Sequence, residues 1–491
     1  MQRKAIGWLV VLVISLIFIA CQPFHLSRKP PPVRIPSEDL QADLVYLFQT
    51  MERVHPNLYA YTPRSVIDSL RKEVIQQLTK PMTAMEFYML VAPIVTSLND
   101  GHTELDFPFV QWGQYLSQGG KQVPLGVFIR ADSLYVKHNY IGDTTLAINS
   151  TLLSINGIPA KTILQRIMRY QSGERLTYRY HKAGRLFPPF LWGIFNFTDQ
   201  FTLEYISALN SHRYTRTFPG ISAKTLDSLK TKTRTKGTSV PYTFTILPQT
   251  HIGLITWRRF RDLSRFESFL DTTFSRIRQD SIQDLIIDIR NNGGGSSTLG
   301  DALFNYITDQ PYTQVAQIQV KASRMARRQF RQRVFQWYMY PLYPLVYFHP
   351  ATRGIFGYPP GTISTHIREP GKPSKKPGRF TGQVYLLIGP RTFSSASMFA
   401  ATFQCYDMGV TIGDETGGVT VSYGDNVYYT LPHTQLKGTV SYKRFVLPCG
   451  KEDGHGVIPD YQVRTTPEDL RNGRDTVLEF TKKFIQSHHQ Q

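Results

Sequence analysis

The sequence predicts an α/β protein whose layered core lies in the second half of the chain. Two runs there, DLIIDIR at 284–290 and GQVYLLIGP at 382–390, are almost continuously apolar, as expected for strands that are buried on both faces. The first is followed by LGDALFNYI at 299–307, which has a helical apolar period, and the second by a similar stretch at 391–403. Strands that alternate with helices in this way indicate a layered α/β core.

Composition restricts the class of protein. The chain has 491 residues, of which 41% are hydrophobic, enough for two or three domains with a sizeable core. Its formal net charge of +20 favours nucleic acid, an anionic membrane or acidic substrates as partners, but no nucleic-acid module is recognisable. Three cysteines, Cys21, Cys405 and Cys449, are too few for a disulfide scaffold or a zinc cluster. The last two either pair with each other or remain buried thiols.

Residues 1–21 have the features of a secretory signal. A basic start is followed by an apolar run from Ile6 to Ala20 and then by Cys21. The ending FIAC resembles the lipobox of bacterial lipoproteins, in which the cysteine is lipidated, and an uncleaved membrane anchor is the alternative. Residues 22–36 are a proline-rich basic tether. We therefore expect an exported lipoprotein, anchored in the cell envelope on the periplasmic or surface side.

Two regions precede the α/β core, and one insertion interrupts it. Residues 37–115 carry helical apolar spacing and form an N-terminal helical unit. Residues 120–235 combine strand-like alternation with an Asn-Gly turn, and their SINGIPAKTIL resembles the end of a PDZ module, so we expect a PDZ-like or accessory insert. The core spans 240–480 and contains a basic, aromatic insertion at 321–380. This insertion is either a surface loop or a flap that faces anionic lipid head groups.

Four stretches carry side chains or backbone groups that are suited to catalysis. LNDGHT at 98–103 places His102 on a turn, and IDIRNNGGG at 287–295 follows a buried strand with glycines that expose backbone N–H groups. RTFSSASMFA at 391–400 holds serines at a strand-to-helix turn, where a serine either caps the helix or acts as a nucleophile. EDGHGVIPD at 452–460 offers an acid in a glycine-rich turn. The glycine loop lacks the spacing of nucleotide-binding motifs.

Together these stretches resemble the tail-specific (C-terminal processing) serine protease family. The resemblance covers 240–465 and, less completely, 37–106. It implies a ClpP/crotonase-like core and a serine peptidase that hydrolyses peptide bonds of envelope or extracellular proteins through an acyl-enzyme. Two alternatives are a non-catalytic ligand- or protein-binding lipoprotein on the same scaffold and an envelope scaffold that acts through the insertion at 321–380.

The resemblance also implies roles for single residues. Ser395 occupies the position of the nucleophile, which is the first serine of the family's S-A-S-E motif. Met398 occupies the position of the glutamate in that motif. The lysine base of the main branch is absent, because Thr420 stands at its spacing. The tricorn-type branch instead implies His102 as the base and Asp453 as the acid that orients it.

The expected chemistry also needs donors for a developing oxyanion. We expect these to be the backbone amides of Ala396 and of Gly293 or Gly294, with Ser394 as a helix cap. No metal or other cofactor is needed. The expected partners are a peptide or protein substrate and, through the lipid anchor, a membrane, whereas nucleic acid is not expected. His433 and His455 are rival candidates for the base.

Overall fold

The computed structural model describes residues 33–233, 240–334, 344, 346–376, 378–466, 468–469 and 472–489. The predicted signal peptide at 1–21, its lipidated Cys21 and most of the tether at 22–36 lie outside these residues, as does the centre of the insertion at 321–380. No helix within the described ranges is long and apolar enough to cross a membrane. The elements discussed below all belong to the unit that begins at Ile35.

A six-stranded sheet forms the centre of the α/β core, with the two predicted apolar strands, β12 (Asp284–Asp288) and β15 (Gln383–Ile388), side by side. The strand order is β10-β11-β12-β15-β16-β19, and neighbours pair in parallel except β10 with β11. The remaining strands are β10 (Tyr242–Ile246), β11 (Ile252–Trp257), β16 (Val410–Gly413) and β19 (Tyr461–Gln462). The predicted α/β fold is therefore confirmed.

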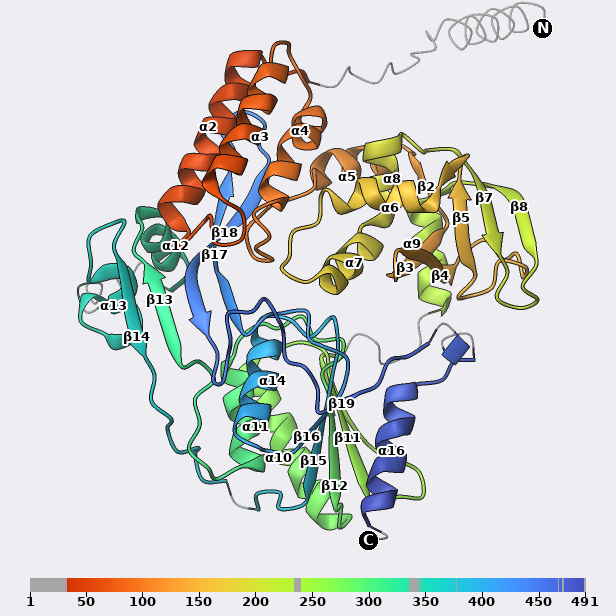
Figure 1. Cartoon of the computed structure of the whole chain (residues 1–491). Helices are drawn as coiled ribbons and strands as arrows, with labels where there is room; N and C mark the ends of the chain where they lie inside the picture. Colours follow the sequence, from red (N-terminus) through yellow and green to blue (C-terminus); the bar gives the residue numbers. More distant parts are fainter. Residues whose placement is uncertain are drawn as a thin grey trace, which may run out of the picture. The chain divides into compact units, whose positions relative to one another are not determined.

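Helices cover both faces of this sheet (Figure 1). One face carries α10 (Leu263–Gln279), α11 (Thr298–Ile307) and α14 (Ser395–Cys405), and the other carries α16 (Thr476–His488). Leu285 and Ile287 of β12 are buried in the core under the three helices. Ile286, between them, is buried with Val477 and Ile485 of α16. Because successive strand residues point to opposite faces, a strand covered on both sides needs apolar residues at every position.

The N-terminal helical unit leads directly to the predicted base. It contains α2 (Ser37–Val54), α3 (Arg64–Gln77), α4 (Ala84–Thr96), β1 (Glu104–Leu105) and α5 (Phe109–Ser117). The predicted apolar stripe of α2 is buried and consists of Leu40, Leu44, Leu47, Phe48 and Met51. Helix α4 begins with a capping box between Thr83 and Glu86, which satisfies two backbone amides at its start. Shortly after α4 ends, the chain reaches His102.

The accessory region is built on a sheet of its own, with the order β3-β4-β5-β7-β8 and β6 beside β5. Its strands are β3 (Leu125–Arg130), β4 (Ser133–Asn139), β5 (Thr151–Ile155), β6 (Ile158–Pro159), β7 (Gln200–Ile206) and β8 (Arg213–Pro219). A separate short pair joins β2 (Lys121–Gln122) to β9 (Ile221–Ser222). The helices are α6 (Ala160–Met168), α7 (Leu176–Arg185), α8 (Phe187–Phe195) and α9 (Ala223–Thr233). Its likeness to a PDZ module remains a prediction.

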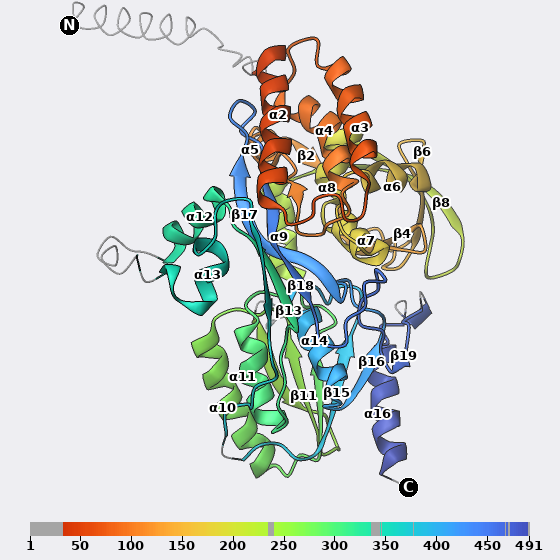
Figure 2. The ribbon, with the colours of Figure 1, turned by 60° about the vertical axis from the view of Figure 1, so that its left-hand side comes forward.

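A long hairpin connects the helical unit with the α/β core. It consists of β17 (Val421–Thr430) and β18 (Lys437–Val446), and β18 also pairs with β1 and β13 (Gln317–Lys321), which in turn pairs with β14 (Ile363–Ile367). Figure 2 shows the hairpin running from the helical unit toward α14. Val440 is buried in the helical core and Phe445 in the α/β core. Since Glu104 of β1 lies opposite Thr439 of β18, the hairpin brings the turn of His102 to the junction of the two cores.

Two further features lie around α14 and in the insertion. Cys405, the last residue of α14, forms a disulfide with Cys449, with their Cα atoms 5.7 Å apart, so the two cysteines pair rather than remain thiols.

The described parts of the insertion include α12 (Arg324–Val334) and α13 (Pro350–Phe356). The Arg327 side chain donates a hydrogen bond from Nε to the carbonyl of Ile355 (2.9 Å), which ties these two helices together.

Candidate active site

The turn between β15 and α14 presents Ser394, not Ser395, to the predicted base. His102 Nε2 lies 3.1 Å from Ser394 Oγ. Ser395 is the first residue of α14, and its Oγ donates instead to the Gly295 carbonyl at 2.7 Å. The prediction of Ser395 as the partner of His102 thus misses by one position, because adjacent residues of a turn point in different directions.

Ser394 has an unusual backbone conformation. Its φ is 56° and its ψ is −127°, a region that a residue with a Cβ occupies only under strain and that is typical of functional sites. Although it stands at the N-cap position of α14, its side chain makes no capping hydrogen bond. Hydrogen bonds on the preceding residues hold the turn: Phe393 N donates to Asn292 O at 3.1 Å, and Thr392 Oγ1 donates to Ile289 O at 2.9 Å.

His102 is held through both its backbone and its ring. Its N–H donates to Asp100 Oδ1 at 2.9 Å, and its carbonyl accepts from Thr439 Oγ1 at 2.9 Å. The imidazole stacks on the Phe393 ring, with 4.7 Å between the ring centroids. Burial lowers the pKa of His102 below its ordinary value, against the opposing charge of Asp100. The neutral imidazole that a general base requires is therefore the favoured form near neutral pH.

Asp100 lies at the centre of a buried hydrogen-bond network that the sequence did not indicate. Besides the His102 N–H, its carboxylate accepts bonds from Thr103 Oγ1 (2.5 Å) and Ser441 Oγ (2.8 Å), and Oδ2 lies 3.1 Å from His55 Nε2. Asn57 N donates to His55 Nδ1 at 3.1 Å, so His55 carries its hydrogen on Nε2 and donates to Asp100. Burial opposes ionisation of Asp100, but the hydrogen bonds from His55 and Thr103 and the electrostatic effect of the two nearby imidazoles outweigh it and lower the pKa of Asp100.

The glycine loop lies directly against the turn between β15 and α14. Gly294 has a φ of 92°, and a Cβ on it would lie 2.7 Å from the Phe393 carbonyl oxygen and 2.9 Å from the Ser395 amide nitrogen. Only glycine permits this approach. The buried Asn292 side chain shapes the loop, since its Oδ1 accepts from Gly294 N at 2.9 Å and its Nδ2 donates to the carbonyl of Trp257 at 3.0 Å.

The predicted oxyanion donors are therefore only partly available. The Gly294 amide is bonded to Asn292, and the Ala396 amide donates to Phe393 O at 3.1 Å. Within the part of the chain that the structure describes, the amides of Gly293 and Ser395 have no acceptor. These two N–H groups, one on the glycine loop and one directly after Ser394, are available to bind a developing negative charge.

Asp453, the predicted orienting acid, does not contact His102. It is exposed, and its Oδ1 accepts from His455 N at 2.9 Å within its own turn. The rival bases also have other partners: His455 Nδ1 lies 3.1 Å from Glu415 Oε1, and His433 Nδ1 lies 3.2 Å from Asp39 Oδ1. The geometry therefore pairs His102, and neither rival, with the serine turn.

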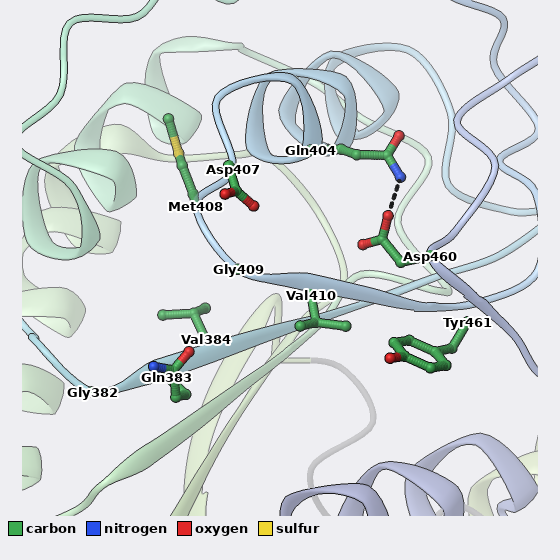
Figure 3. A pocket seen from close by; sticks show the side chains of 10 residues that line it. All are labelled: Gly382, Gln383, Val384, Gln404, Asp407, Met408, Gly409, Val410, Asp460 and Tyr461. Atoms are coloured by element: carbon green, nitrogen blue, oxygen red, sulfur yellow. Dashed lines mark hydrogen bonds between the residues drawn. The ribbon is translucent and has the colours of Figure 1, made fainter. Parts of the chain in front are cut away.

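The pockets lie away from this constellation. Figure 3 shows a pocket of about 400 Å³ at the start of β15 and the end of α14, where Gln404 Nε2 donates to Asp460 Oδ1 at 3.0 Å. Ser394 lies at the opposite end of both elements, so this pocket is not part of the site. A second pocket of about 440 Å³ is lined by Asp453, His455 and the disulfide. No group of three or more metal-binding side chains occurs among the described residues.

Comparisons with known proteins agree with the fold of the α/β core. Residues 251–463 match the family model described as Peptidase family S41. The structure of mature CPAF is similar, with a TM-score of 0.57 and 14% identity over 88% of this chain and 94% of that one. Mature CPAF complexed with lactacystin gives a TM-score of 0.61 at 14% identity, over 91% of this chain and 97% of that one. Among curated proteins, no relative was found by sequence.

Proposed function

Because residues 251–463 belong to peptidase family S41, we propose that this serine peptidase hydrolyses peptide bonds of envelope or extracellular proteins through an acyl-enzyme on Ser394. The observation that carries the proposal is the 3.1 Å contact between Ser394 Oγ and His102 Nε2. It joins two turns that are 292 positions apart in the sequence. A nucleophile and a base within hydrogen-bond distance are the signature of covalent catalysis by a serine.

The reaction begins with attack of Ser394 Oγ on the peptide carbonyl carbon. The Oγ–H proton moves to His102 Nε2, and the resulting imidazolium returns it to the leaving amine, which departs with the C-terminal part of the substrate. A water molecule then attacks the acyl-enzyme, with His102 again accepting the proton. Hydrolysis of the ester restores Ser394 and releases the N-terminal part of the substrate.

The negative charge of the tetrahedral intermediate needs fixed donors. The amides of Gly293 and Ser395 supply them in this proposal, since neither has an acceptor among the described residues. The start of α14 adds the positive end of its dipole at the same place. Loss of one such donor typically slows the reaction by about 10²- to 10³-fold.

The proposal also places the protein outside the cytoplasm, anchored at the membrane through lipidated Cys21. The basic start and apolar run of residues 1–21 support export. The disulfide between Cys405 and Cys449 supports an oxidising compartment, because such bonds persist there. Metabolic labelling with an alkyne fatty acid tests the anchor: the wild type takes up the label and Cys21→Ala does not. Equal labelling of both would remove this part of the proposal.

A fluorophosphonate probe tests the nucleophile without knowledge of the substrate. The wild type and Ser395→Ala should be labelled, and the modified peptide should contain Ser394. Ser394→Ala should lose labelling, and its peptidase activity should fall by about 10³- to 10⁶-fold. If Ser395→Ala loses the label instead, the neighbouring hydroxyl is the nucleophile. If the wild type is not labelled, the proposed function fails.

A further inference from the structure

Two buried polar groups without side-chain partners flank one glycine beside the proposed site. His102 Nδ1 is buried and has no hydrogen-bond partner within the described ranges, and both carboxylate oxygens of Glu174 are buried there without a side-chain partner, with only the backbone amides of Gly101 and of Glu174 itself close by. A Cβ on Gly101 would lie 2.9 Å from Glu174 Oε2. Because neighbouring Cα atoms are about 3.8 Å apart, this carboxylate is within reach of the next side chain, that of His102. Buried polar groups are rarely left unpaired, and each such group calls for an explanation.

The Phe393 ring provides a second link between the two groups. Its Cζ atom would lie 2.8 Å from the same Gly101 Cβ, and its ring stacks on the imidazole of His102. The ring of Tyr178 from α7 also stacks on Phe393, with 4.0 Å between the ring centroids. Glu174, which lies just before α7, His102 and the serine turn are therefore packed around one aromatic ring.

The residue that follows Glu174 is anchored to the α/β core. Arg175 forms an ion pair with Glu415, and its Nη1 donates to the Gly454 carbonyl at 3.2 Å. The neighbouring residue is therefore fixed by groups that lie outside the accessory region. The carboxylate of Glu174 is held at its position by the fold rather than left there by a loose loop.

The hydrogen bond to Ser394 determines the tautomer of His102. To accept the hydroxyl proton, Nε2 must be unprotonated, so the hydrogen of the neutral ring is on Nδ1. This buried Nδ1–H needs an acceptor. Three carboxylates have charges that act on His102, and each is occupied: Asp100 in its network, Glu104 with Lys182, and Asp425 with Lys443.

We propose that Glu174 is the positioning residue for His102 and that its carboxylate accepts the Nδ1–H hydrogen bond through one bridging water. The inference rests on the function proposed above, since it assigns a partner to the base of that site. It also gives Glu174 the part that the sequence assigned to Asp453. When His102 takes the Ser394 proton, the carboxylate stabilises the imidazolium, as the acid of a serine-protease triad does.

The surroundings of Glu174 make its ionisation observable. Burial, reinforced by the negative charge of Asp100, raises the pKa of Glu174 to about 8, while the backbone amides of Glu174 and Gly101 and the charge of Lys182 act in the opposite direction. Burial also raises the pKa of the nearby phenols of Tyr61 and Tyr178, so neither titrates near neutral pH. A step near pH 8 can therefore be assigned to Glu174.

The experiment measures the rate constant of fluorophosphonate labelling at Ser394 from about pH 5 to about pH 9.5. The wild-type rate should rise twice, first as His102 loses its proton and again near pH 8 as Glu174 ionises. In Glu174→Gln the second rise should vanish, and the rate at high pH should be about 10- to 100-fold lower, the effect of losing a hydrogen bond to a charged group. Glu174→Asp keeps a carboxylate and should keep the second rise at reduced height.

Asp425→Asn is the matched control, because the charge of the exposed Asp425 also reaches His102 while its side chain is paired with Lys443. It should keep both rises. If Glu174→Gln retains the second rise and the wild-type rate, or if the control loses the rise equally, the proposal is overturned. Circular dichroism at each pH confirms that the variants compared are folded. A wild type that takes no label refutes the proposed function instead, so the two failures are distinguishable.

Discussion

Two buried carboxylates near Gly101 differ in their hydrogen bonding and in the direction of their pKa shifts. Asp100 accepts four hydrogen bonds, and its pKa is lowered because its hydrogen bonds and the two nearby imidazoles outweigh the effect of burial. Glu174 has no side-chain hydrogen-bond partner among the described residues, and burial raises its pKa to about 8. The bonded carboxylate builds the turn of His102. The unbonded one is costly to the fold, and such a cost is expected where a group serves a reaction.

Removal of Asp100 should have the largest effect. In Asp100→Ala the His102 turn loses its central acceptor, and His55, Thr103 and Ser441 lose a partner. We expect the free energy of unfolding to fall by about 3–5 kcal/mol, the cost of breaking a buried charged network. Labelling at Ser394 should slow by about 10²-fold or more, because a displacement of the catalytic base by about 1 Å lowers the reaction rate by that factor. Urea unfolding and the labelling rate measure both, and an unchanged stability would contradict the assigned role of Asp100.

The labelling rate at acidic pH tests the pKa of His102, the residue that follows Gly101. Burial lowers the pKa of His102 from its ordinary 6.5, and only the neutral ring accepts the Ser394 proton. The wild-type labelling rate should therefore reach half of its first plateau below pH 6.5 and fall about tenfold per pH unit below that midpoint. A midpoint above pH 6.5 would mean that the charge of Asp100 dominates over burial.

The sequence predicted the fold better than the site, and the reason is physical. The continuous apolar run of β12 and the apolar stripe of α2 directly report burial, and both are found as expected. The DGHT turn and the glycine loop both lie beside the turn of Ser394 in the structure. Whether Ser394 or Ser395 faces His102 depends on a single φ of 56°, which no residue pattern specifies.

Other parts of the site depend on contacts between distant segments. His55 and Ser441 reach Asp100 across separations of 45 and 341 positions, and neither belongs to a motif. Glu174 comes from the accessory region, whose sequence carries no sign of catalysis. Asn292 alone had a local signal, since it immediately precedes the three glycines of the loop, where its side chain accepts from the Gly294 amide.

Replacement of Glu174 should change stability in the opposite direction to the loss of Asp100. Glu174 releases its proton near pH 4.5 in an unfolded chain and near pH 8 in the folded protein. Between these values the folded state holds the extra proton, so this group lowers the free energy of unfolding as the pH rises. Glu174→Gln should match the wild type near pH 5 and exceed its stability at pH 9 by about 1–3 kcal/mol. Unfolding in urea at the two pH values measures the difference, and a less stable variant at pH 9 would contradict the raised pKa of Glu174.

The smallest effect should come from a single donor to Asp100. Ser441 is fully buried and donates from Oγ to Asp100 Oδ2 at 2.8 Å. Ser441→Ala removes this bond but leaves the carboxylate with three others, so we expect a loss of about 0.5–1.5 kcal/mol in the free energy of unfolding and an unchanged pH profile of labelling. Equilibrium unfolding in urea measures the loss. A cost as large as that of Asp100→Ala would show that the network acts as one cooperative unit, in which no donor is dispensable, and the contrast with the unbonded Glu174 would then be sharper than the separate bonds suggest.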